Sequence, residues 1–221
     1  MNLELARSNM VEQQIRPWEV LDQGVLDLLY IVPREEFVPL SCRNLAFSDM
    51  EIPIGEGEKM WPPKLEARVL QELAPKRSDR VLEIGTGSGY FTALLAHRSA
   101  HVYSVEIRPA LAAFGKANIA RHGLDNVTLA TGDGASSIPR EFPYAGPYDI
   151  VVLTGSVPVL PKGLLDWLAP GGRAFAVVGE APIMTAKIIS HPAPGGLQTV
   201  ELFETLVAPL ANCEQSPHFT F

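Results

Sequence analysis

Apolar positions recur at helical spacing near the start of the chain. Val25, Leu26 and Leu29 fall on one face of such a helix, and Pro33 is expected to end it. Residues 3–31 are therefore predicted to be helical. The same spacing returns over residues 64–74, where another helix is expected.

The segment between these helical regions, residues 39–63, carries repeated prolines and glycines and is predicted to be a long loop. A long irregular segment inside a compact fold is commonly either functional or disordered. Its apolar side chains, which include Phe47, Ile52 and Trp61, favour a packed and functional loop.

Short apolar runs then alternate with helical patterns. Strands are predicted at residues 80–84, 101–105, 127–130, 148–153 and 173–178, and helices at residues 90–97, 110–122 and 161–168. This alternation predicts an α/β fold of the Rossmann-like, doubly wound type, with a mostly parallel sheet and right-handed crossovers. Residues 183–190 and 201–206 are predicted to add antiparallel strands at the end of the chain.

No linker or internal repeat divides the chain, so one domain is expected over residues 1–221. Within it, residues 1–75 form a helical and loop region, residues 76–180 the α/β core, and residues 181–221 the C-terminal strands. Apolar residues make up 47% of the chain and charged residues 19%, which is typical of a globular protein and excludes wholesale disorder.

The net charge of −7 argues against a non-specific nucleic-acid binder and against attachment to an acidic membrane surface. No apolar stretch is long enough to span a bilayer, and the N-terminus lacks the apolar core of a signal peptide. The only cysteines, Cys42 and Cys213, form no CxxC motif, and the histidines are scattered. We therefore expect a cytoplasmic protein without a metal site.

A glycine-rich turn provides the strongest chemical signal. Gly85, Gly87 and Gly89 follow a predicted strand directly and precede a predicted helix. Glycines allow a tight turn and a close approach of the backbone to a ligand, and the helix N-terminus offers free N–H groups. The spacing is GxGxG, which differs from the GxGxxG of dinucleotide-binding proteins.

Two carboxylates follow at matching positions. Glu106 ends the second strand, 21 residues after Gly85, where an acid can accept both hydroxyls of a ribose. Asp133 lies between Gly132 and Gly134 after the third strand, where it can accept from an exocyclic amine such as that of adenine. Because the carboxyl ends of adjacent parallel strands meet at one edge, the three features predict one nucleotide-type site.

This combination resembles the class I S-adenosylmethionine (SAM)-dependent methyltransferases. The segment at residues 148–154 and the Ala-Pro-Gly-Gly turn at residues 169–172 are similar to theirs as well. The resemblance implies SAM as cofactor, with S-adenosyl-L-homocysteine as product. The implied cofactor-binding residues are Glu83, Gly85, Thr86, Gly87, Ser88, Gly89, Glu106, Ile107, Asp133, Gly134 and Thr154.

A closer resemblance, over residues 9–210, is to the protein-L-isoaspartate O-methyltransferases. It is carried by Val81 to Tyr90, by Val32-Pro33-Arg34-Glu35 and by Ile54-Gly55-Glu56-Gly57. This family methylates a carboxylate of isoaspartyl or D-aspartyl residues and so begins protein repair through a succinimide. The resemblance implies a protein or peptide substrate. The methyl transfer requires no strong base, since the acceptor carboxylate is already ionised at neutral pH.

The substrate loop departs from the family pattern Gly-x-Gly-Gln-Thr-Ile-Ser. Here Glu58, Lys59 and Trp61 stand where that pattern has glutamine, threonine and serine. An indole offers a single donor and far more bulk than a hydroxyl, whereas Lys59 could supply charge to a carboxylate. The candidate substrate-side residues are therefore Asp49, which resembles the aspartate of the family's Ala-Tyr-x-Asp motif, together with Lys59 and Trp61.

Three alternatives stay open. The chain could be a diverged relative that methylates another acceptor. It could also bind SAM without retaining the repair activity. A nicotinamide-dependent oxidoreductase is the third alternative, and the GxGxG spacing counts against it.

Overall fold

The computed structural model describes residues 2–135, 142–161, 163–192 and 196–214. The chain begins with helix α1 (Leu3–Met10), which continues through a π-helical turn (Val11–Ile15) and a 3₁₀ turn (Arg16–Trp18). Helix α2 (Gln23–Ile31) follows, with the Asp22 side chain accepting the Val25 N–H at its start. The helices predicted in residues 3–31 are thus confirmed, although they are broken where Pro17 interrupts the hydrogen bonding.

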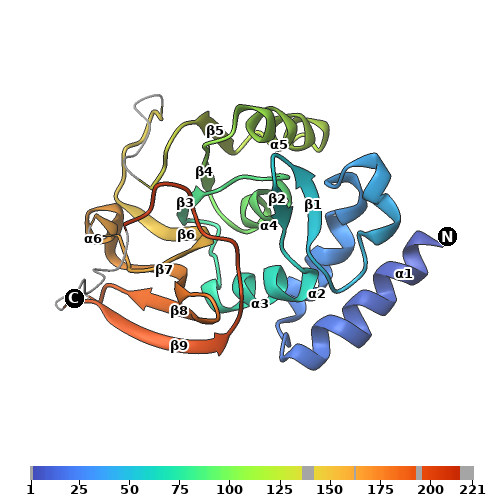
Figure 1. The fold of residues 1–221 in the computed structure, drawn as a ribbon, viewed down its shortest axis with the longest axis horizontal. Coiled ribbons are helices and arrows are strands. Elements are labelled where there is room, and N and C mark those ends of the chain that lie inside the picture. The colour runs from blue at the N-terminus through green and yellow to red at the C-terminus, as the bar shows by residue number, and fades with distance from the viewer. Residues whose placement is uncertain (1, 136–141, 162, 193–195, 215–221) are drawn as a thin grey trace, which may run out of the picture.

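The central sheet has seven strands in the order β5-β4-β3-β6-β7-β8-β9 (Figure 1). The strands are β3 (Arg80–Ile84), β4 (His101–Glu106), β5 (Val127–Thr131), β6 (Tyr148–Val157), β7 (Leu168–Glu180), β8 (Ile183–Ser190) and β9 (Gln198–Glu204). Strands β3 to β7 pair in parallel, and β8 and β9 are antiparallel additions. The predicted doubly wound α/β fold with antiparallel C-terminal strands is confirmed.

Helices connect the parallel strands: α3 (Pro63–Leu73) precedes β3, α4 (Tyr90–Arg98) joins β3 to β4, and α5 (Pro109–Arg121) joins β4 to β5. Strand β3 lies between β4 and β6, so the strand order reverses beside it. Open α/β sheets bind ligands at such a switch point, outside the carboxyl ends of the strands. Those ends here are Ile84, Glu106 and the residues after Leu153 in β6.

The predicted long loop contains a short antiparallel hairpin, β1 (Ile52–Gly55) with β2 (Glu58–Met60). Ile52 and Ile54 are buried and alternate with exposed neighbours, which is a strand pattern that Pro53 and the flanking glycines obscure in the sequence. Helix α6 (Leu164–Trp167) is shorter than the predicted range of residues 161–168, and β7 begins directly after it at Leu168. In the view of Figure 1 the hairpin lies between the central strands and the N-terminal helices.

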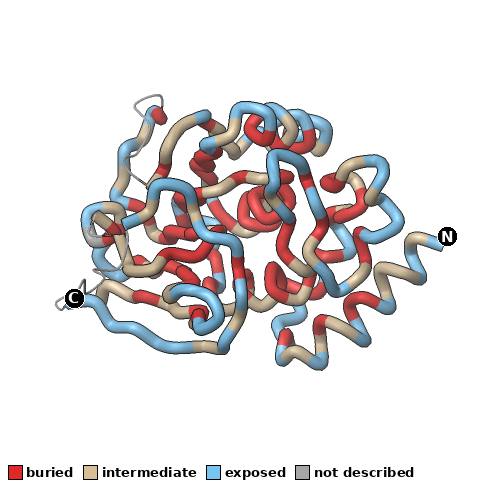
Figure 2. The backbone as a smooth tube through the Cα atoms, in the orientation of Figure 1, coloured by how far each residue is buried: buried red, intermediate tan, exposed pale blue. Residues whose placement is uncertain are grey.

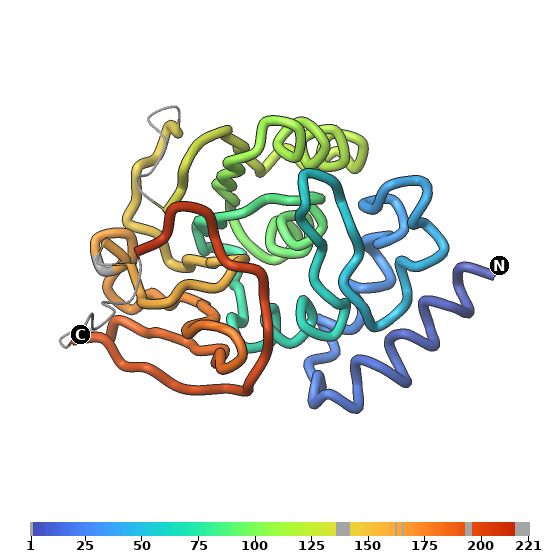
Figure 3. The backbone as a smooth tube through the Cα atoms, in the orientation of Figure 1, coloured from blue at the N-terminus to red at the C-terminus, as the bar shows by residue number. Residues whose placement is uncertain are grey.

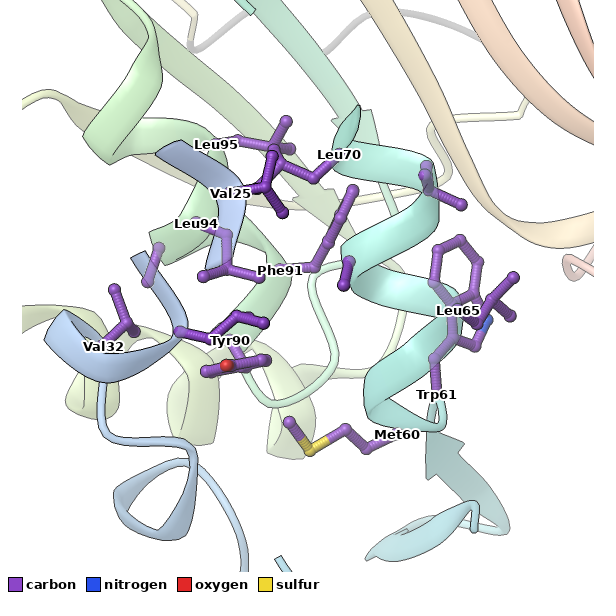
Figure 4. Close-up of a cluster of buried hydrophobic side chains, with 14 of the residues drawn as sticks. Val25, Val32, Met60, Trp61, Leu65, Leu70, Tyr90, Phe91, Leu94 and Leu95 are labelled. Atoms are coloured by element: carbon purple, nitrogen blue, oxygen red, sulfur yellow. The ribbon is translucent and has the colours of Figure 1, made fainter. Parts of the chain in front are cut away.

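Two clusters of buried apolar side chains form the core. The first joins the N-terminal helices, the hairpin and helices α3 and α4 to the sheet, as the concentration of buried backbone in Figure 2 indicates. Figure 4 shows Leu70 of α3 beside Leu95 of α4, and Phe91 of α4 pointing toward α3, whereas Leu65 lies on the other side of α3. The N-terminal region is thus packed directly against the part of the fold that carries the glycine turn. In the part of the chain that the structure describes, no helix is long and apolar enough to cross a membrane.

Candidate active site

The glycine turn is fixed to the neighbouring strand by Thr154. The Thr154 hydroxyl lies 2.8 Å from both the Ile84 and the Gly85 carbonyl oxygens. Gly85 has a φ of +101°, and a Cβ at this position would lie 2.1 Å from Thr154 Oγ1. Only glycine fits both the backbone angle and the space, so this close contact sets the path of the turn.

Glu106 ends β4 beside the glycine turn and is 5% exposed. Its Oε2 accepts the Gly87 N–H at 2.8 Å, and its Oε1 accepts the Arg108 N–H at 3.0 Å. The carboxylate is therefore held in place by two backbone donors. Each oxygen retains a lone pair that can accept a further hydroxyl from a ligand.

Asp133 follows β5 and has both oxygens engaged. Its Oδ1 accepts the Ala135 N–H at 3.1 Å, and its Oδ2 accepts the Asn212 amide at 3.0 Å. Gly134 beside it is buried, and a Cβ there would lie 3.0 Å from Ile84 and 3.2 Å from Val105. The acid is thereby held close to the ends of β3 and β4.

These groups line one open pocket, which the ends of the parallel strands, the glycine turn and the β1–β2 hairpin share. Pockets at the carboxyl ends of the strands of such a sheet commonly bind nucleotide-type ligands. Among the predicted cofactor residues, those that line it are Gly85, Thr86, Gly87, Ser88, Glu106, Ile107, Asp133, Gly134 and Thr154. The glycine turn, the fixed Glu106 carboxylate and Asp133 fit SAM.

Glu83 does not line this pocket, in contrast to the expectation from the sequence. It is fully buried, and its Oε2 accepts hydroxyl hydrogen bonds from Thr92 at 2.5 Å and Ser104 at 2.6 Å. The Ser104 hydroxyl also lies 2.6 Å from that of Thr86 in the glycine turn. Burial raises the pKa of Glu83 to about 7. Glu83 thus supports the turn from behind. Gly89, the residue that caps the N-terminus of α4, also lies outside the pocket lining.

The three substrate-side candidates occupy different environments. Lys59 and Trp61 line the pocket, whereas Asp49 does not and instead forms an ion pair with Lys64 at 2.7 Å. The Lys59 ammonium lies 2.9 Å from a Glu51 carboxylate oxygen, and its side chain is 53% exposed. The structure therefore brings two of the three candidates to the pocket.

Trp61 both packs in the apolar core and lines the pocket. It is 7% exposed, and its ring centroid lies 5.7 Å from that of Phe91 and 6.0 Å from that of Phe175. Figure 4 shows the indole beside Leu65 at the start of α3. The indole thus fills an apolar gap and also forms part of the pocket wall.

Sequence reasoning missed two further parts of the pocket wall. One is the Glu58–Arg108 ion pair, in which Arg108 Nε donates to Glu58 Oε1 at 2.8 Å. The other is the segment after β9, residues 207–211, which returns to β6 as Figure 3 shows. There Ser156 N donates to Ala208 O, and Leu210 N donates to Ser156 O, both at 2.9 Å. Neither contact could be predicted from a local sequence pattern, because each joins residues that are distant in sequence.

Comparisons with known proteins agree with this geometry. The model of the family described as protein-L-isoaspartate(D-aspartate) O-methyltransferase matches residues 5–215. A structure from Plasmodium falciparum, described as a protein-L-isoaspartate O-methyltransferase in complex with S-adenosyl-L-homocysteine, superposes with a TM-score of 0.78. That match covers 91% of this chain and 96% of the other at 22% identity, so it shows the shared fold.

Two relatives have substantial sequence identity. A protein-L-isoaspartate O-methyltransferase from Methanoculleus marisnigri is 38% identical over 92% of this chain and 90% of its own length. Another, protein-L-isoaspartate O-methyltransferase 1 from an Anaeromyxobacter species, is 43% identical over 87% of this chain and 90% of its own length. The chain therefore belongs to the protein-L-isoaspartate(D-aspartate) O-methyltransferase family.

Proposed function

We propose that this enzyme transfers a methyl group from SAM to the free carboxylate of an isoaspartyl or D-aspartyl residue in a protein or peptide. The observation that carries the proposal is the continuity of one pocket. Its inner part holds the glycine turn, Glu106 and Asp133, and its outer part holds Lys59 and Trp61 of the substrate loop. The family relationship supports the same reaction.

The inner part of the pocket holds the cofactor in this proposal. Glu106 accepts the ribose hydroxyls, Asp133 accepts from the adenine amine, and the turn from Gly85 to Ser88 lies along the cofactor backbone. Bound SAM supplies an electrophilic methyl group on its sulfonium. Thr154 holds the turn in the conformation that this binding needs.

The outer part positions the acceptor. A carboxylate with a pKa near 4 is already ionised at neutral pH, so the chain needs no general base for this transfer. Its work is to orient one acceptor oxygen in line with the methyl group and to exclude water. Ile54, Met60 and Phe91 give the wall an apolar surface, and Lys59 supplies the positive charge that a carboxylate needs.

A second acceptor class is favoured by Trp61. The family pattern has a serine at this position, whereas the indole here is buried between Phe91 and Phe175 and offers no hydroxyl. A smaller or differently shaped acceptor would suit such a wall. The loss of the serine hydroxyl at this position would also be compatible with a protein that binds SAM but no longer repairs isoaspartyl residues.

Transfer of labelled methyl from SAM to matched peptides tests the proposal. An isoaspartyl peptide, a D-aspartyl peptide and the ordinary aspartyl peptide of the same sequence are compared. Selective and saturable labelling of the isoaspartyl peptide is the expected result. Binding of S-adenosyl-L-homocysteine with no labelling of any of the three peptides would refute the proposed acceptor and favour the second class. We also propose the cytoplasm as the location, because the two cysteines of the sequence form no CxxC motif and indicate no disulfide framework.

A further inference from the structure

Arg34 is the most completely buried cation in the described part of the chain. It lies in a 3₁₀ turn (Arg34–Glu36) and has no exposed surface. Its Nε donates to the Ala46 carbonyl at 2.9 Å, its Nη2 to the Trp61 carbonyl at 2.5 Å, and its Nη1 to the Glu66 carboxylate. One planar guanidinium thus joins three segments that are distant in sequence.

Two of these partners belong to the outer part of the pocket. Trp61 and Glu66 both line it, and Glu66 lies on α3, which begins two residues after Trp61. Strand β2 ends at Met60, so the Trp61 carbonyl belongs to neither the hairpin ladder nor the helix. Its bond to Arg34 fixes the backbone at the point where the indole enters the pocket wall.

The same guanidinium also faces the cofactor side of the fold. The Arg34 Cζ lies 4.9 Å from the centroid of the Tyr90 ring, within the range of a cation–π contact. Tyr90 is the first residue of α4, directly after the glycine turn. Burial lowers the pKa of Arg34 to about 10, which still leaves it charged at neutral pH. Arg34 therefore contacts both the acceptor wall and the helix that follows the cofactor turn.

We infer that Arg34 is a positioning residue that holds Trp61 for acceptor recognition. This inference rests on the proposed methyl transfer. A lysine at this position keeps the charge, but its single nitrogen cannot replace the three guanidinium nitrogens that donate to Ala46, Trp61 and Glu66. In the Arg34→Lys variant we expect the loop at Trp61 to move relative to the cofactor site. Acceptor binding suffers, while the residues that hold the cofactor keep their contacts.

The test compares Arg34→Lys with Leu70→Ala, a control chosen for stability. Leu70 is fully buried in α3 and does not line the pocket, so its truncation lowers the thermal stability without touching the acceptor wall. Both variants are assayed well below their melting temperatures. The measured quantities are KM and kcat for an isoaspartyl peptide and Kd for S-adenosyl-L-homocysteine.

A second readout is independent of turnover. Trp18→Phe and Trp167→Phe leave Trp61 as the remaining tryptophan, so its emission reports the packing of the indole. We expect Arg34→Lys to raise KM by about tenfold or more, to change the cofactor Kd by less than about threefold, and to shift the Trp61 emission to longer wavelength. Leu70→Ala is expected to leave KM and emission at the wild-type values.

The outcomes separate this inference from the proposed function. If wild type labels no isoaspartyl peptide, the proposed function fails, and the Trp61 emission still decides whether Arg34 holds the indole. If wild type labels the peptide but Arg34→Lys behaves like Leu70→Ala in both KM and emission, the inference is overturned and Arg34 serves stability alone.

Discussion

Glu58 and Arg108 join the β1–β2 hairpin to the strand end that carries Glu106. Arg108 donates from its Nε and its Nη2 to Glu58 Oε1. Its backbone N–H donates to Glu106 Oε1. The hydrogen bonds to Glu58 raise the pKa of Arg108. The hairpin of the substrate side is thereby tied to the carboxylate proposed to hold the ribose.

Glu58→Gln tests this link. Glutamine keeps one acceptor oxygen but loses the charge that attracts Arg108, so the hairpin should open more often. We expect the Kd for S-adenosyl-L-homocysteine to rise roughly two- to fivefold at low salt, because partly exposed ion pairs contribute modestly. The difference from wild type should shrink at high salt, where screening already weakens the pair. Equal affinity at low salt would show that the pair does not restrain the pocket.

Glu106→Gln tests the proposed ribose contact. Loss of a charged acceptor for two hydroxyls should weaken cofactor binding by roughly 1–3 kcal/mol. Calorimetric titration with S-adenosyl-L-homocysteine measures it. Asp125→Asn is the control, since Asp125 is an exposed carboxylate outside the pocket lining. An unchanged Kd in Glu106→Gln would refute the role.

Gly85→Ala tests the contact that sets the glycine turn. The added Cβ meets Thr154 Oγ1 at 2.1 Å, so the turn must shift and cofactor affinity should fall by about tenfold or more. Gly123→Ala is the matched control, because Gly123 also has a positive φ of +64° but has open space around it. If both variants bind the cofactor like wild type, the close contact is not required for the turn.

Substitutions of Lys59 and of Glu51 are expected to change the KM for an isoaspartyl peptide in opposite directions. Lys59→Met removes the positive charge offered to the acceptor carboxylate and should raise KM for an isoaspartyl peptide. Glu51→Gln removes the anion that competes for Lys59, which lies 2.9 Å away, and should lower KM. We expect changes of roughly two- to tenfold, as for partly exposed charges. Changes of the same sign in both variants would contradict a carboxylate-binding role for Lys59.

The pKa of Glu83 predicts a pH dependence of stability. Its ordinary value of 4.5 rises to about 7 in the folded chain because the group is buried. Between these values the unfolded chain releases a proton that the folded chain keeps, so the contribution of Glu83 to stability is largest below pH 4.5 and falls by roughly 3 kcal/mol as the pH rises from 4.5 to about 7. Glu83→Gln should flatten this slope in denaturant titrations. A slope identical to that of wild type would rule out the shift.

The sequence predicts the fold well, and the glycine turn, Glu106 and Asp133 that it singles out line one pocket, whereas it indicates less of the substrate side. The glycine turn and Glu106 depend on local order, a strand followed by a tight turn, which periodicity and spacing reveal. The hairpin was hidden because Pro53 and its neighbouring glycines resemble a loop. The positions of Asp49 and Glu58 depend on ion pairs with distant partners, and no local pattern encodes them.

Arg34 illustrates the same limit. It stands between a proline and two glutamates, a context typical of a solvated turn, yet it is fully buried. Its partners Ala46, Trp61 and Glu66 lie 12 to 32 residues away. The tertiary packing of the N-terminal region against the end of the β1–β2 hairpin and the start of α3 brings them to one guanidinium.

Mass spectrometry of a reacted isoaspartyl peptide tests the central claim most directly. The peptide is incubated with the enzyme and SAM, and the ordinary aspartyl peptide of the same sequence serves as control. The account predicts a methyl ester on the isoaspartyl carboxyl, followed by loss of methanol as the succinimide forms, with no change in the control. A folded enzyme that binds S-adenosyl-L-homocysteine but leaves the isoaspartyl peptide unmodified would contradict it.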